Sequence, residues 1–105
     1  MALNKKDNKQ QGKPKKTKVF LVDQHVCNFI KEEWMKDMKS FRDWGKQHGV
    51  HEAVSRKINQ KEGYNIPLST LKIICFYKQI TMHNFFNLVE KKYGDAEDKF
   101  YYIEK

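Results

Sequence analysis

The chain has 105 residues, with 21 lysines and arginines against 13 aspartates and glutamates, and a formal net charge of +8. That length suits one small domain with tails, and the charge predicts an anionic partner, most often nucleic acid. The sequence contains no apolar run long enough to cross a membrane and no apolar segment after its early lysines, so we expect a soluble cytoplasmic protein without a signal peptide.

The first 18 residues differ sharply in composition from the rest of the chain. They contain seven lysines and one acid, Asp7, and therefore carry +6 of the net charge of +8, which leaves +2 for residues 19–105. Because almost no apolar side chain is available to bury, residues 1–18 are predicted to form a disordered basic arm. Such an arm can attract nucleic-acid phosphates and reach a minor groove, or it can serve only as a solubility tail.

An apolar quartet at residues 19–22 is typical of a strand, and the following Asp23 is a candidate N-cap. A first helix of about 12 residues is predicted after it, because apolar residues recur at spacings of three and four. These residues are Val26, Phe29, Ile30 and Trp34. Cys27 lies in this helix and Cys75 far along the chain, so we expect two reduced, buried thiols.

Two short helices joined by a tight turn are predicted between Ser40 and Asn59. Ser40 can cap the first helix, Gly49 ends it, and the second runs over about residues 51–59. Gly45 supplies a small residue where the two helices touch. This geometry can present the outer face of the second helix to the major groove of DNA.

Two further helices complete the predicted domain. After a polar loop at residues 60–67, Ser69 is expected to cap the fourth helix and Thr81 the fifth, which ends at Gly94. Five short helices with short polar connections predict a compact all-α domain over residues 19–93.

The tail at residues 94–105 is acidic and then aromatic, and residues 100–103 within it are strand-like. Pairing of this segment with residues 19–22 would give a small β ribbon, either within one chain or across a dimer. The chain also has more aromatic residues than a small five-helix core can bury, which predicts a homodimer interface in the tail. The alternative is that the tail folds back over its own core.

The stretches SFRDWGKQHGVHEAVSRKIN (residues 40–59) and NIPLSTLKIICFYKQITMHNFF (residues 65–86) resemble the Cro-type (XRE-like) helix-turn-helix family of phage and bacterial regulators. The shared signals, in chain order, are a small residue in the second helix, a glycine–hydrophobic turn and an isoleucine late in the third helix. They continue with a proline-containing loop, a leucine at the opening of the next helix, a hydrophobic–Ser/Thr entry to the fifth helix and a closing apolar pair. In this chain they are Gly45, Gly49-Val50, Ile58, Pro67, Leu71, Ile80-Thr81, Phe85 and Phe86. The resemblance implies a five-helix lambda-repressor-like domain that binds double-stranded DNA and regulates transcription.

The resemblance also indicates which side chains would contact DNA. Positions early and late in the third helix would read bases, their neighbours on its open side would assist, and basic residues at the edges of the motif would contact phosphates. The candidates are His51, Glu52, Ala53, Ser55, Arg56, Lys57, Asn59, Lys61, Arg42 and Lys46. Alternatively, Glu52 and Arg56 form an ordinary surface pair four residues apart, and the other charges are simply solvated.

Catalysis is not expected from this sequence. The four histidines are scattered without an HxxxH pair, and neither a phosphate-binding loop nor a dinucleotide motif is present. We therefore predict no enzyme activity, metal, cofactor or small-molecule substrate. Two alternatives to DNA binding stay open: a protein-interaction or antitoxin-like accessory factor that uses the helical domain or the aromatic tail, and an RNA-binding protein that uses the basic arm.

Overall fold

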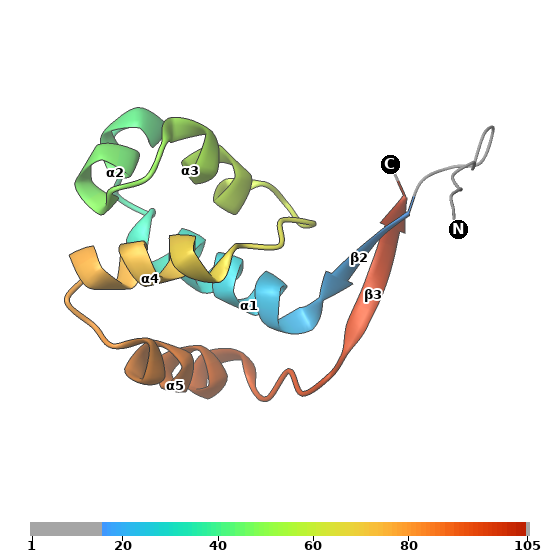
Figure 1. Cartoon of the computed structure of the whole chain (residues 1–105). Helices are drawn as coiled ribbons and strands as arrows, with labels where there is room; N and C mark the ends of the chain where they lie inside the picture. The colour runs from blue at the N-terminus through green and yellow to red at the C-terminus, as the bar shows by residue number, and fades with distance from the viewer. Residues whose placement is uncertain (1–15, 105) are drawn as a thin grey trace, which may run out of the picture.

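The computed structural model describes residues 16–104, which are mostly helical and end in a two-stranded antiparallel sheet (Figure 1). The predicted set of five helices with a small terminal ribbon is confirmed. None of the described helices is long and apolar enough to span a membrane. In chain order the elements are β2 (Lys16–Phe20), α1 (Leu21–Phe29), the π-helical turn η1 (Ile30–Trp34), α2 (Phe41–His48), α3 (Glu52–Asn59), α4 (Leu68–Tyr77), α5 (Met82–Tyr93) and β3 (Phe100–Glu104).

The ribbon pairs β2 with β3 of the same chain, from Lys16 opposite Glu104 to Phe20 opposite Phe100. Val19 on its inner face is completely buried. The predicted arm of residues 1–18 is therefore too long, because residues 16–18 are strand, and residues 1–15 lie outside the described residues. Composition alone does not reveal these three strand residues, since their backbone partners are more than 80 positions away.

The first helix begins earlier than predicted. Asp23 is not its N-cap: α1 starts at Leu21, and Phe20 occupies the cap position without a side-chain hydrogen bond. The backbone N–H of Leu21 donates instead to the carbonyl of Lys99 (2.9 Å), so the tail satisfies a donor that helices usually leave to a side chain. Leu21 and Val22, expected in the strand, are consequently helical.

The helix continues into η1, where the wider π-helical turn ends with the Met35 N–H donating to the carbonyl of Ile30 (3.0 Å). Helix α5 is fastened to this turn by its last residues. The Lys92 ammonium lies 2.9 Å from Glu32 and 2.7 Å from Glu33, and the Tyr93 hydroxyl donates to Glu32 (2.6 Å). Burial and the Glu32 hydrogen bond raise the pKa of Tyr93 to about 12.

The ends of the last two helices were predicted with mixed success. Ser69 does not cap α4, which begins at Leu68 directly after Pro67, where the fixed proline backbone angle suits a helix start. Thr81 does cap α5, since its hydroxyl accepts from the Asn84 N–H (3.0 Å), and Gly94 ends that helix as predicted.

The five helices and η1 contribute to one core, α1 through Val26, Cys27 and Phe29. Its largest fully buried side chains are Ile30, Trp44, Ile58, Ile74 and Phe85, which come from η1, α2, α3, α4 and α5. The indole N–H of Trp44 donates to the carbonyl of Trp34 (2.8 Å) and so meets its hydrogen-bonding need inside this core. In Figure 1 α2 and α3 lie on one side of α1 and α4, and α5 lies on the other.

Candidate nucleic-acid interface

Helices α2 and α3 are joined by a short turn at residues 49–51, and the two helices have well-defined ends. The Asp43 N–H donates to the Ser40 hydroxyl (3.0 Å) at the start of α2, and Gly49 ends that helix with φ of 73°, a left-handed angle that favours glycine. At the start of α3, Nδ1 of His51 accepts from the Ala53 N–H (3.0 Å). His51 is therefore an N-cap, which leaves its ring less free for base contact than the sequence prediction assumed.

Gly45 lets the two helices approach closely. A Cβ atom at this position would lie 2.6 Å from the carbonyl oxygen of Val50 and 3.1 Å from Oγ of Ser55, and the first of these distances is a clash. The Val50 N–H also donates to the Gly45 carbonyl (2.9 Å), which ties the turn to α2. The absence of a side chain at residue 45 therefore sets the rotation of α3 against α2.

That rotation buries one predicted contact residue. Ser55 has 0% exposure, and its hydroxyl has no hydrogen-bond partner, so it cannot contact a ligand on the open side of α3. The prediction for Ser55 is wrong because close packing of α3 on Gly45 turns this residue inward beside Ile58. Asn59 is half-buried and lies at the edge of the buried side.

The open side of α3 is a strip of four exposed residues: Ala53, the adjacent pair Arg56 and Lys57, and Gln60. The sequence prediction included the first three. It missed Gln60, which directly follows the helix and whose side-chain amide donates to the Glu62 carbonyl (3.0 Å). Gln60 lies three residues after Lys57 and four after Arg56, so helical spacing extended one residue beyond Asn59 would have predicted it.

Arg56 is held in place by two neighbours. Its Nε and one terminal nitrogen donate to the same carboxylate oxygen of Glu52 (3.1 and 2.7 Å), and its guanidinium carbon lies 4.9 Å from the ring centroid of Phe41. The hydrogen bond from Arg56 lowers the pKa of Glu52, which therefore stays ionised. The predicted surface pair does form, but both partners are solvent-accessible and can rearrange around a ligand.

A hollow of about 420 Å³ opens at the N-terminus of α3. Two basic residues of α2 line it together with the first residues of the turn and of α3. The lining residues are Arg42, Lys46, Val50, His51 and Glu52. The two cations and the positive end of the α3 dipole attract anions, whereas the carboxylate of Glu52 in the same lining opposes them. The structure thus brings four predicted residues together here, while Lys61 is exposed beyond the far end of α3.

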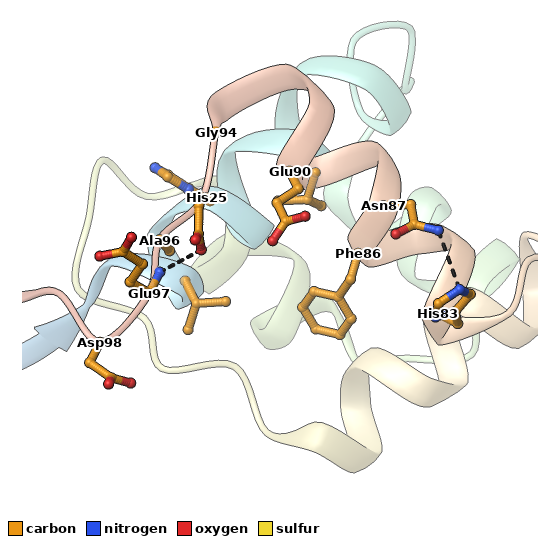
Figure 2. A pocket seen from close by; sticks show the side chains of 12 residues that line it. His25, His83, Phe86, Asn87, Glu90, Gly94, Ala96, Glu97 and Asp98 are labelled. Carbon is orange, nitrogen blue, oxygen red and sulfur yellow. Dashed lines mark hydrogen bonds between the residues drawn. The ribbon is translucent and has the colours of Figure 1, made fainter.

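A second hollow, of about 390 Å³, lies between α1, α5 and the loop that follows Gly94 (Figure 2). The ring of His25 at its edge stacks on Tyr93, with centroids 5.2 Å apart. Within residues 16–104, no three metal-ligating side chains gather into a binding site. The charged residues that line this hollow, apart from its two histidines, are acidic, namely Glu90, Asp95, Glu97 and Asp98.

These two surfaces divide the charge of the molecule. Residues 40–61 contain five basic and two acidic side chains, a net charge of +3, whereas residues 90–98 contain two lysines and four acids, a net charge of −2. The pair of helices α2 and α3 and the end of α5 lie on opposite sides of α1 and α4 (Figure 1). A polyanion is therefore attracted to one side and repelled from the other. No protein-family model, characterised protein or solved structure matches this chain, so the assignment of a function depends on this geometry.

Proposed function

We propose that the protein is a sequence-specific regulator that binds double-stranded DNA, with α3 in the major groove. The observation that carries the proposal is the exposed strip on α3. Its side chains are able to read bases, and α3 is the second of two helices joined by a tight turn. The resemblance to XRE-like regulators and the segregated charge support the same conclusion.

Each side chain of the strip has a suitable chemistry. Arg56 and Lys57 can donate to O6 and N7 of guanine, Gln60 can pair with N6 and N7 of adenine, and the methyl group of Ala53 can contact a thymine methyl. Glu52 can keep Arg56 in position or accept from cytosine N4.

The basic hollow at the start of α3 would hold the DNA backbone. Arg42 and Lys46 flank the turn there, so a phosphate in the hollow would contact both side chains. Lys61 would contact the backbone at the opposite end of α3. Together these contacts fix the register in which the strip meets the bases.

The proposal is tested by selecting bound duplexes from a random pool and measuring affinity for the enriched motif. We expect Lys57→Ala or Arg56→Ala to weaken binding roughly 5- to 150-fold and to relax the preference at one base position. Lys91→Ala, the same charge change at an exposed position of α5, serves as the matched control and should behave like the wild type.

Two outcomes of the selection are informative beyond the single variants. A palindromic motif would indicate a homodimer with two copies of α3 one DNA turn apart. If no motif is enriched, or if Lys57→Ala and Lys91→Ala weaken binding equally, the attraction is only electrostatic and the assignment of α3 as the reading element is wrong.

A second candidate function, docking of a protein partner, is favoured by the solvent-facing side of α4. Leu68 and Phe76 are 71% and 68% exposed, and Ile73 and Tyr77, which line a hollow together with Phe76, are also accessible. Adjoining apolar side chains of this size often mark a protein-binding surface. Loss of complex formation in Phe76→Ser, with duplex binding retained, would assign α4 to a partner protein.

A further inference from the structure

The outer face of the β2–β3 ribbon carries an unusual set of exposed side chains. Successive residues of a strand point to opposite faces, so Val19 faces the core while Phe20, Phe100 and Tyr102 face outward. These three rings are between 43% and 56% exposed. The outward face of a small ribbon is ordinarily polar, so three accessible rings on it require an explanation.

Two of the three rings lie next to a lysine. Phe100 lies between the other two, with its centroid 5.9 Å from that of Phe20 and 5.9 Å from that of Tyr102, and both pairs are edge-to-face. The ammonium of Lys18 lies 4.2 Å from the Phe100 centroid and 5.4 Å from the Phe20 centroid. Aromatic faces and a cation are thus presented side by side on one surface.

The charge of this face is positive. Lys16 and Lys18 point outward against a single acid, Glu104, so the outward side chains of the two strands carry a net charge of +1. A nucleic-acid strand has the complementary properties, a phosphate backbone and flat bases. Only unpaired bases offer a free face for stacking on aromatic side chains, because those of a duplex are stacked on one another.

We propose that the outer face of the ribbon binds single-stranded nucleic acid. Phe100 and Tyr102 stack on bases, Phe20 supports Phe100, and Lys18 moves from the rings to a phosphate. This site goes beyond the duplex-binding function proposed for α3, and it lies at the end of the molecule away from α2 (Figure 1).

A second copy of the chain is a poorer occupant of this face. Packing two ribbons face to face would remove four lysines from water, two per copy, with only one outward glutamate per copy to compensate. A flexible strand of phosphates instead matches every lysine with an opposite charge.

The experiment measures fluorescence anisotropy of labelled ten-nucleotide oligo(dT), oligo(rU) and a duplex of the same length with the full chain. We expect the single strands to bind and Phe100→Ala/Tyr102→Ala to weaken that binding about tenfold or more. Tyr102→Phe keeps the ring and should bind like the wild type. Phe76→Ala, which removes an exposed ring from α4, is the matched control. The ratio between oligo(dT) and oligo(rU) shows whether DNA or RNA is preferred.

The outcomes separate this site from the proposed duplex site. Arg56→Ala should leave single-strand binding unchanged, and Phe100→Ala/Tyr102→Ala should leave the selected duplex motif unchanged. Circular dichroism of the double variant verifies that the helices are intact. The proposal is overturned if the double variant, correctly folded, binds oligo(dT) as tightly as the wild type. A dimer in sedimentation that the double variant abolishes would equally overturn it, by assigning the face to a second copy.

Discussion

Ser55 of α3 packs against Gly45 of α2, and the small size of Gly45 explains why Ser55 is buried. The missing side chain at residue 45 brings α3 close enough that Ser55 is buried without a partner for its hydroxyl. A buried hydroxyl that forms no hydrogen bond costs free energy, which a methyl group in the same place would not.

Ser55→Ala should therefore raise the free energy of unfolding by about 1 kcal/mol, since it removes an unpaired polar group and favours the helix. Chemical denaturation of the two proteins measures this change. Ser69→Ala, at an exposed position at the start of α4, is the control and should alter stability by less than about 0.5 kcal/mol. Because Ser55 does not reach the open side, the affinity for duplex DNA should stay the same. A loss of affinity would show that Ser55 does contact DNA.

His48 makes the stability of α2 depend on pH. Its ring is buried, stacks on Trp44 with centroids 4.0 Å apart, and Nδ1–H donates to the Trp44 carbonyl (2.8 Å). Burial, with the positive charge of Lys78, lowers the pKa of His48 below its ordinary value of about 6.5.

As the pH falls below about 6.5, the unfolded chain therefore takes up a proton that the folded chain resists, and the free energy of unfolding decreases. We expect a decline between pH 7 and pH 5 that is smaller in His48→Gln, whose side chain does not titrate. His83→Gln, which removes an exposed histidine of α5, should retain the full decline. The same pH dependence in both variants would show that His48 is not responsible. The pKa of His25 is also lowered by burial, so part of the decline should persist in His48→Gln.

At the scale of helices and strands, two local caps were predicted correctly from sequence, the Ser69 cap was wrong, the His51 cap was missed, and the distant hydrogen bonds were not predictable. Ser40 and Thr81 cap their helices through N–H groups only three residues away, so their roles are visible in a short window. Asp23 is not a cap because α1 begins two residues before it, at Leu21, whose N–H donates to Lys99, nearly 80 residues away.

The same distinction holds for the candidate site. The resemblance to XRE-like regulators supplied Ala53, Arg56 and Lys57 of the open strip, and apolar periodicity located α3 itself. It did not give the rotation of α3 about its axis, which depends on contact with Gly45, and therefore it placed Ser55 on the wrong side. Gln60 was missed because the helical pattern ends at Asn59 while the exposed strip continues one residue further.

Gly45→Ala tests how α2 and α3 are spaced. In an exposed helix this change would stabilise by roughly 1 kcal/mol. Here the new methyl group would meet the Val50 carbonyl at 2.6 Å, so we expect the free energy of unfolding to fall by about 1–3 kcal/mol instead. Thermal and denaturant unfolding give the sign directly. Lys46→Ala, an exposed change in the same helix, is the comparison; if Gly45→Ala proves as stable as the wild type, the two helices can separate without loss.

At the scale of the whole molecule, the charge is divided between a basic helix-turn-helix and an acidic surface beyond α5. The largest concentration of positive charge is in residues 1–15, with five lysines against Asp7. The helix-turn-helix supplies the specific contacts in this view, and the N-terminal lysines add attraction that does not depend on base sequence.

Deleting residues 1–15 should weaken duplex binding and flatten its salt dependence by about 0.9 in log–log slope for every phosphate that the lysines contact. The slope is measured from affinities at several salt concentrations. A full-length variant with the five lysines changed to glutamine isolates the effect of charge from that of length. An unchanged slope in both proteins would mean that these lysines make no contact with DNA.

The pairing of β2 with β3 also has a kinetic consequence. Residues in the ribbon are joined to partners 80 to 88 positions away, whereas the helices form through neighbours a few positions apart. Closing so long a loop costs chain entropy that only an already compact body can offset. The five helices should therefore pack together first, and the two strands should pair in the last step of folding. An early folding intermediate would then expose Val19 and would lack the outer face of the ribbon on which Phe20, Phe100 and Tyr102 lie.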